Sequence, residues 1–352
     1  MTAIDLGLPG LGGLDGVPTT DEPQKAKDYK SDQEVRWCPG CGDYVVLNAV
    51  QSFLPSLGLK RENIVFVSGI GCSSRFPYYM NTYGMHSIHG RAPAIATGLA
   101  VARPDLSVWV VTGDGDALSI GGNHLIHTLR RNVNLKILLF NNRIYGLTKG
   151  QYSPTSEEGK VTKSTPLGSL DHPFNPVSLA LGAEASFVGR AIDSDRKGLT
   201  EVLRQAAEHR GSALVEIYQN CPIFNDGAFD VLKDADEAQR RIINLTHGRP
   251  ITFGRDDEYA VVRDGFGLAV AKTSEVDGSD VVVHDATDHN LAFALSRLST
   301  QDLTHTITGV FRNVQRSTYD DAARAQVEQA KQAQTADLAA LLRGKDTWTV
   351  AG

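Results

Sequence analysis

The segment GDGDALSIGGNHLIHTLRRNVNLKILLFNN, residues 113–142, contains the pattern that decides the fold. It begins directly after the β-branched run 106–112, and it contains the apolar run 135–140; both runs have the length and composition of strands. Between them, residues 121–131 carry apolar side chains at helical spacing. A strand, a helix and another strand in succession predict an α/β fold.

The same alternation continues on both sides of this segment. Helix and strand patterns take turns along the chain, at 43–58 (helix), 62–70 (strand), 92–102 (helix), 186–192 (strand), 199–210 (helix) and 212–219 (strand). We therefore predict a doubly wound, mostly parallel sheet.

Composition divides the chain into three parts. Residues 1–30 are rich in glycine, proline and aspartate without a period, which is typical of a tail or arm. Residues 31–225 hold the alternating pattern and are predicted to form the main domain. Residues 226–352 contain short mixed segments and close with a long alanine- and glutamine-rich helix pattern. We expect this C-terminal region to pack on the main domain or on a partner.

Length and charge exclude some classes of function. The 352 residues carry a formal net charge of −6, so the chain lacks the basic surface typical of nucleic-acid-binding proteins. No apolar run approaches the roughly 20 residues that a membrane span needs. The N-terminus has no basic segment followed by an apolar one, so we expect a cytoplasmic protein.

Unusual residues follow four of the predicted strands. They are Gly71-Cys72, Gly113-Asp114-Gly115, Asn141-Asn142 and Cys221. Ligands of open α/β sheets bind outside the carboxyl ends of the strands, so this placement predicts one binding site there.

Asp114 indicates a cation in that site. The neighbouring glycines allow a backbone to approach a phosphate closely, but a carboxylate would repel the phosphate unless a cation lay between them. Mg²⁺ prefers oxygen ligands and phosphate partners. The side-chain amide of Asn142 and the backbone carbonyl of Ile144 could supply further oxygens. A plain Gly-Asp turn is the alternative for this motif taken alone.

The four cysteines are Cys38, Cys41, Cys72 and Cys221. The Cys-x-x-Cys pair at the start has three ordinary meanings, namely a redox-active disulfide, part of a zinc site, or part of an iron–sulfur site. A thioredoxin-like pair would not explain the other two cysteines at strand ends. A zinc ribbon more often shows two such pairs, whereas four thiolates are the usual set for a cubane cluster. Zinc stays open as the alternative.

The Gly-Asp-Gly and Asn-Asn pair resembles the thiamine diphosphate fingerprint. Together with WCPGCG, GIGCSSRFPYYMNTYGMHSIHGRAPAIATG, NNRIYGLTKGQYSPTS and NCPIFND, over roughly residues 35–230, it resembles the β subunits of 2-oxoacid:ferredoxin oxidoreductases. The resemblance implies that residues 31–225 bind thiamine diphosphate, that Asp114, Asn142 and Ile144 hold Mg²⁺, and that the four cysteines hold one [4Fe-4S] cluster. It implies cofactor contacts at Ile70, Gly71, Cys72, Ser73, Gly113, Gly115, Asp116, Gly146 and Leu147.

The resemblance also implies an activity and partners. A β subunit of this type would oxidatively decarboxylate a 2-oxoacid with coenzyme A and reduce ferredoxin. The closest likeness is to the 2-oxoglutarate type, which forms succinyl-CoA and CO₂; pyruvate or a broad range of 2-oxoacids is the alternative. Only one half of a thiamine site is present in the sequence, so an α subunit should supply the other half, as in an α2β2 assembly.

Two residues are predicted to contact the substrate. Arg75 follows the strand that leads to Cys72, and an Arg fork suits a carboxylate; a structural salt bridge is the alternative. His89 could contact cofactor or substrate, or belong to a structural loop. The stretch 157–164 is predicted to be a solvated loop. Two rival functions are a thiamine-dependent decarboxylase without an electron carrier and a non-catalytic scaffold that binds a cluster or zinc.

Overall fold

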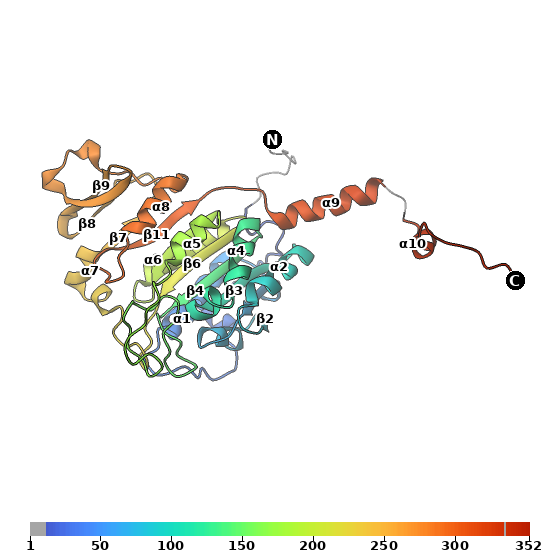
Figure 1. The fold of residues 1–352 in the computed structure, drawn as a ribbon, viewed down its shortest axis with the longest axis horizontal. Helices are drawn as coiled ribbons and strands as arrows, with labels where there is room; N and C mark the ends of the chain where they lie inside the picture. The colour runs from blue at the N-terminus through green and yellow to red at the C-terminus, as the bar shows by residue number, and fades with distance from the viewer. Residues whose placement is uncertain (1–11, 334–335) are drawn as a thin grey trace.

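The computed structural model describes residues 12–333 and 336–352 of the chain. Within these residues, eight strands form one sheet (Figure 1) in the spatial order β2 (Tyr83–His86), β1 (Ile64–Ser68), β3 (Ser107–Gly113), β4 (Leu135–Asn141), β6 (Ser212–Tyr218), β5 (Phe187–Ile192), β11 (Thr306–Asn313) and β7 (Ile242–Leu245). A second sheet has three strands, β10 (Gly267–Lys272), β9 (Tyr259–Asp264) and β8 (Thr252–Phe253).

The main sheet is mostly parallel. The six strands from β2 to β5 in spatial order pair in parallel, and β7 pairs in parallel with β11. Within the described part of this sheet, the pairing of β11 with β5 is antiparallel. The predicted doubly wound, mostly parallel α/β fold is therefore confirmed.

Helices cover both faces of the main sheet. Their bounds are α1 (Asp43–Phe53), α2 (Ala92–Ala102), α3 (Asp114–Leu118), α4 (Gly122–Arg131), α5 (Pro176–Gly182), α6 (Arg196–Glu208), α7 (Ala235–Arg241), α8 (His289–Leu298), α9 (Tyr319–Ala333) and α10 (Leu338–Arg343). Helices α1 and α6 pack on one face, whereas α2, α4, α5 and α8 pack on the other.

The central strands are buried along nearly their whole length because both faces are covered. In β3, Val108 and Val110 belong to the core under α2 and α4, while Trp109 and Val111 belong to the core under α1 and α6. Successive side chains of a strand point to opposite faces, so a strand buried on both sides reads as a continuous apolar run. This is why the sequence pattern identifies β1, β3 and β4 so clearly.

The C-terminal region is partly integrated into the main sheet. Strands β7 and β11 lengthen the sheet beyond β5, and α8 packs on β11. Helix α9 leaves the body of the molecule (Figure 1) and most of its side chains are exposed. The region thus contributes strands to the main sheet as well as packing on it.

The described part of the N-terminal arm lies against the main domain. Residues 1–11 of the predicted arm lie outside the described residues. Gly13 donates its backbone N–H to Glu208 O, and Tyr29 is fully buried. Residues 12–30 are thus a packed arm. In the part of the chain that the structure describes, no helix has the length and apolar character needed to cross a membrane.

Candidate cofactor site

A cavity of about 150 Å³ lies at the carboxyl ends of β1, β3 and β4. The neighbouring parallel strands end at the same edge, so the residues that follow them converge there. The lining includes the predicted Ile70, Gly71, Cys72, Ser73, His89, Gly113, Asp114, Gly115, Asp116, Asn142, Ile144, Gly146 and Leu147. Four parts of the chain, at 70–73, 89, 113–116 and 142–147, therefore share one cavity.

Asp114 is buried at the first position of α3, directly after β3. Ser153 Oγ and Thr155 Oγ1 donate hydrogen bonds to its Oδ2 at 2.5 and 2.6 Å. Burial nevertheless raises the pKa of Asp114 to about 6. A cation beside this carboxylate would favour its charged form, so the site suits a divalent metal.

Asn142 and Ile144 are brought to the cavity by an unusual turn. Arg143, between them, has a φ of +56°, in the left-handed region that non-glycine residues rarely adopt. Asn142 Oδ1 accepts the backbone N–H of Ile144 at 3.1 Å, and Asn225 Nδ2 donates to Asn142 O at 2.9 Å. Strained backbone of this kind persists where the surroundings fix it, often at functional sites.

Gly115 is required for contact with an aromatic ring. A Cβ at Gly115 would lie 2.1 Å from Cε1 of Tyr145, and the Tyr145 hydroxyl donates to Gly115 O at 3.1 Å. The glycine therefore lets Tyr145 close over the start of α3. Gly71 has a φ of +119°, which a residue with a side chain rarely adopts.

Asp116 lines the cavity, but its carboxylate also has structural partners. It accepts the backbone N–H of Gly90 at 2.7 Å and the hydroxyl of Thr112 at 2.8 Å. These bonds attach the loop containing His89 to the end of β3. The predicted contact of Asp116 with the cofactor stays a prediction.

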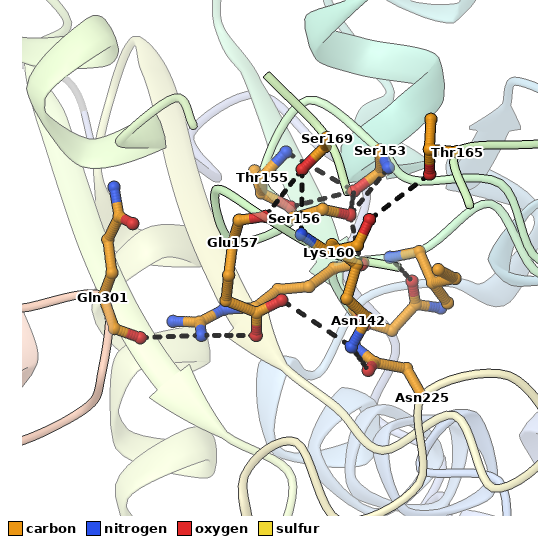
Figure 2. Close-up of polar contacts among 12 residues, drawn as sticks. Asn142, Ser153, Thr155, Ser156, Glu157, Lys160, Thr165, Ser169, Asn225 and Gln301 are labelled. Atoms are coloured by element: carbon orange, nitrogen blue, oxygen red, sulfur yellow. Dashed lines mark hydrogen bonds and ion pairs between the residues drawn. The ribbon is translucent and has the colours of Figure 1, made fainter. Parts of the chain in front are cut away.

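The segment after Asn142 is held by a dense polar network (Figure 2). Lys160 Nζ donates to Asn225, and Glu157 pairs with Arg143 at 3.2 Å. Ser169 Oγ donates to Glu157 O at 2.9 Å and accepts from the backbone of Lys160. The stretch 157–164, predicted as a solvated loop, is therefore tied to the cavity by Glu157 and Lys160, which are only partly exposed.

The turn that carries Cys38 and Cys41 lies next to the last cysteine, Cys221, beside the same cavity. Cys38-Pro39-Gly40-Cys41 forms a tight turn, because Cys41 N donates to Cys38 O at 3.1 Å and Gly40 has a φ of +81°. The next residue, Gly42, donates its N–H to Asn220 O at 3.0 Å, which attaches this turn to the residue before Cys221.

The sulfur atoms of Cys72 and Cys221 approach a common point. A Cβ at Gly146 would lie 3.6 Å from both sulfurs. Burial raises the pKa of Cys72 to about 11 and that of Cys41 well above its usual range, and the charge of the nearby Asp43 raises both further. These thiols would be protonated without a metal, so metal binding would release protons.

Among the described residues, no three His, Cys, Asp or Glu side chains stand close enough together to hold a single metal ion. A cubane cluster binds each thiolate through a different iron atom, so its ligands stand further apart than those of one zinc ion. The Cys72 and Cys221 sulfurs near Gly146, with the Cys38–Cys41 turn attached beside Cys221, fit that donor set.

The two predicted substrate residues differ in placement. His89 is exposed and lines the cavity. Arg75 is half-buried in the segment Ser73–Tyr79 and is not among the residues that line the cavity. It lies near enough to Cys72 for its charge to lower the pKa of that thiol in opposition to burial. Both substrate contacts stay predictions.

Sequence reasoning missed four residues that fix this site. They are Ser153, Thr155, Glu216 and Asn225. A single hydroxyl or amide side chain in a loop does not by itself form a recognisable sequence motif. Only the fold brings these side chains to Asp114 and the Asn-Asn pair. A glutamate inside an otherwise apolar strand, as in SALVEIY, is the one signal that could have pointed to Glu216.

Comparison with known proteins agrees with this geometry. Residues 69–217 match the family described as thiamine pyrophosphate enzyme, C-terminal TPP binding domain. The 2-oxoglutarate oxidoreductase subunit KorB of Mycobacterium tuberculosis is 71% identical over 356 aligned residues, which cover 99% of this chain and 95% of that protein. The chain belongs to the family of 2-oxoacid:ferredoxin oxidoreductase β subunits. The resemblance inferred from the motifs is thus confirmed.

A solved structure and an archaeal member of this β-subunit family extend the comparison. The structure of 2-oxoglutarate:ferredoxin oxidoreductase from Magnetococcus marinus, solved with 2-oxoglutarate, coenzyme A and succinyl-CoA bound, matches with a TM-score of 0.73 and 35% identity. It covers 89% of this chain and 94% of the solved one. The β subunit of 2-oxoacid:ferredoxin oxidoreductase 2 from Aeropyrum pernix is 44% identical over 56% of this chain and 64% of its own length.

Proposed function

We propose that this chain is the β subunit of a 2-oxoglutarate:ferredoxin oxidoreductase, which converts 2-oxoglutarate and coenzyme A to succinyl-CoA and CO₂ and passes the electrons to ferredoxin. The observation that carries the proposal is the single cavity that gathers Asp114, Asn142 and Ile144 beside the cysteines. The relatives named for 2-oxoglutarate support the choice of substrate.

The chemistry of the residues in the cavity suits each of them to a part of cofactor binding. Thiamine diphosphate, when bound, supplies the electron sink for loss of CO₂ from a 2-oxoacid. Asp114, the Asn142 amide and the Ile144 carbonyl would hold Mg²⁺, and the backbone around Gly71 and Gly115 leaves room for the diphosphate. Tyr145 packs over the start of α3 and donates its hydroxyl hydrogen bond to Gly115 O.

The four cysteines would hold a [4Fe-4S] cluster beside the cofactor. Cys72 belongs both to the cavity lining and to the group of sulfurs near Gly146, so electrons leaving the substrate would have a short path to the cluster. This arrangement supports an oxidoreductase over a decarboxylase without an electron carrier. Cys38 is the exposed member of the set, which suits transfer onward to ferredoxin.

We further propose an α subunit as the partner, in an α2β2 assembly. The relatives are named as subunits, and the sequence carries the fingerprint of only one half of a thiamine site. The partner would supply the groups that hold the rest of thiamine diphosphate. The cytoplasmic location expected from the N-terminal sequence stays a prediction.

The test is to tag this chain in its native cell and isolate the complex without oxygen. We expect bound thiamine diphosphate, four iron atoms for each copy of this chain, and coenzyme A-dependent reduction of ferredoxin with 2-oxoglutarate. Pyruvate serves as the comparison substrate. Zinc in place of iron, or decarboxylation without electron transfer, would contradict the proposal. A preference for pyruvate would change only the substrate.

A further inference from the structure

The two asparagines of the Asn-Asn pair face different cavities. Asn142 lines the cofactor cavity, whereas Asn141 lines a second cavity of about 140 Å³ on the other side of the turn. Asn141 is the last residue of β4 and is buried. Its side chain therefore cannot serve the cofactor directly, and its contacts indicate a different task.

The side-chain oxygen of Asn141 contacts both arms of the candidate Mg²⁺ site. Asn141 Oδ1 accepts the backbone N–H of Arg143 at 3.1 Å, which holds the left-handed turn that presents Asn142. It also lies 2.9 Å from Thr155 Oγ1, whose hydroxyl has a nearer acceptor in Asp114 Oδ2 at 2.6 Å. The amide oxygen thus holds the turn and lies next to the hydroxyl that bonds Asp114.

A buried ion pair sets the orientation of that amide. Glu216 Oε1 accepts from Asn141 Nδ2 at 2.7 Å, so the nitrogen end of the amide faces Glu216 and the oxygen end faces Thr155. Glu216 Oε2 accepts from Arg190 Nε at 2.7 Å, and both side chains are at most 1% exposed. Arg190 also donates to Ser299 Oγ and Ile307 O, so the pair is anchored at several points.

We infer that Asn141, oriented by the Glu216–Arg190 pair, is a positioning residue for the cation site. Glu216 fixes which end of the Asn141 amide faces the turn, and that end holds the Arg143 backbone in its left-handed form, beside the Thr155 hydroxyl that bonds Asp114. The inference rests on the proposed function, because it assigns the residues that orient the ligands of the proposed Mg²⁺.

The test measures cation affinity in the complex of this chain with its partner subunit. Asn141→Leu keeps the volume and removes the hydrogen bonds of the amide with the Arg143 backbone N–H and with Glu216. We expect it to weaken Mg²⁺ binding at saturating thiamine diphosphate by about 10- to 100-fold, the usual cost of losing a partner that orients a metal ligand. Titration calorimetry gives the affinity, and a higher Mg²⁺ concentration should restore cofactor binding.

Two variants at position 155 keep the inference testable if Asn141→Leu does not fold. Thr155→Val removes the hydroxyl and should weaken Mg²⁺ binding by about tenfold. Thr155→Ser keeps the hydroxyl and should restore affinity close to that of the parent. The matched control is Thr97→Val, because the Thr97 hydroxyl donates to Pro93 O on α2 and contacts neither Asp114 nor the Arg143 turn. Its affinity should equal that of the parent.

A double-mutant cycle tests the part played by Glu216. If Glu216 acts through Asn141, Glu216→Gln should weaken Mg²⁺ binding in the parent and add nothing in Asn141→Leu. Additive losses of Mg²⁺ affinity in the double variant would show that Glu216 does not act through Asn141. Folded Asn141→Leu and Thr155→Val proteins that bind Mg²⁺ like the parent would overturn the positioning role. A parent complex that binds neither Mg²⁺ nor thiamine diphosphate would instead overturn the proposed function.

Discussion

The two ends of the main sheet bury polar side chains in different ways. At the amino end, Lys136 Nζ donates to Asn134 Oδ1, His209 O and Gly211 O at 3.0, 2.6 and 3.3 Å. At the carboxyl end, Asp114 has two hydroxyl partners, but it also faces the cofactor cavity. At the amino end Lys136 bonds only to other protein groups, whereas at the carboxyl end Asp114 also faces the cofactor cavity.

This difference predicts which substitutions alter stability and which alter binding. Buried polar groups whose partners all belong to the protein hold elements together, as the amino-end network does for the start of α9. Buried polar groups that face a cavity keep part of their bonding capacity for a ligand. Substitutions at the amino end should therefore alter unfolding, and substitutions at the carboxyl end should alter binding.

The largest effect is expected from a matched pair of buried aspartates. Asp114→Ala should weaken Mg²⁺ and thiamine diphosphate binding by more than about 100-fold, because it removes a proposed Mg²⁺ ligand and not merely a residue that orients one. Asp320→Asn, at the amino end, removes a buried charge that accepts from Asn134 N and Arg324. Equilibrium dialysis should find its cofactor affinity unchanged. Equal losses in both variants would contradict the division.

The second effect concerns the ion pair beneath Asn141. Arg190→Met leaves Glu216 buried and uncompensated and should lower the free energy of unfolding by about 3–5 kcal/mol. The double variant Arg190→Met with Glu216→Leu removes both charges and should recover much of that loss. Denaturant titration of the cofactor-free chain measures both. A single variant as stable as the parent would show that the pair is not effectively desolvated.

The sequence predicts the centre of the sheet better than its edges. Strands β1, β3 and β4 are buried on both faces, so their residues form mostly apolar runs, with Lys136 in β4 as the charged exception. The edge strand β2 is exposed along its whole length, so it carries no such signal. Strands β7 and β11 are far from the α/β repeat in sequence, and their place in the main sheet depends on long-range packing.

The candidate site shows the same limit. Residues that directly follow a strand could be assigned from the sequence, because the strand ends fix where they lie. Thr155 and Glu216 reach the site only through tertiary hydrogen bonds, and apart from the lone glutamate in the apolar strand β6 the sequence near them gives no sign of this. Local pattern therefore predicts the cavity lining, and only the three-dimensional structure identifies the groups that orient it.

The third effect is a pH dependence of the free energy of unfolding, and it arises from His209 at the amino end of the main sheet. Burial and the nearby Lys136 lower the pKa of His209 from 6.5 to about 3. Because the unfolded state then binds a proton more readily, the His209 contribution to stability is full above pH 6.5 and is lost as the pH falls. At pH 5 the loss should be about 2 kcal/mol, since each pKa unit corresponds to about 1.4 kcal/mol.

The measurement compares the parent with His209→Gln across pH 7.5 to about 5, the range in which the two pKa values predict the change. Burial raises the pKa values of Asp43 and Asp114, so these groups contribute with the opposite sign, and both proteins share them. The difference in unfolding free energy between the two proteins should therefore narrow toward acid. A difference that stays constant with pH would contradict the assignment to His209.

The smallest effect should appear where α9 joins the amino end. Arg210 makes a two-point contact with Asp321, from Nε to Oδ2 at 2.9 Å and from the terminal nitrogen to Oδ1 at 2.7 Å. Arg210→Lys keeps the charge but loses the fork, so we expect a loss of about 1–2 kcal/mol in the local opening of α9, the worth of one charged hydrogen bond. Hydrogen exchange of the α9 amides measures this loss.

The control Arg204→Lys alters an exposed ion pair on α6 and should change stability by less than about 1 kcal/mol. Cofactor affinity should stay unchanged in both variants, because neither arginine lines the cofactor cavity at the opposite end of the strands. Faster exchange spread over β3 and β4 instead of α9 would show that Arg210 supports the sheet as a whole.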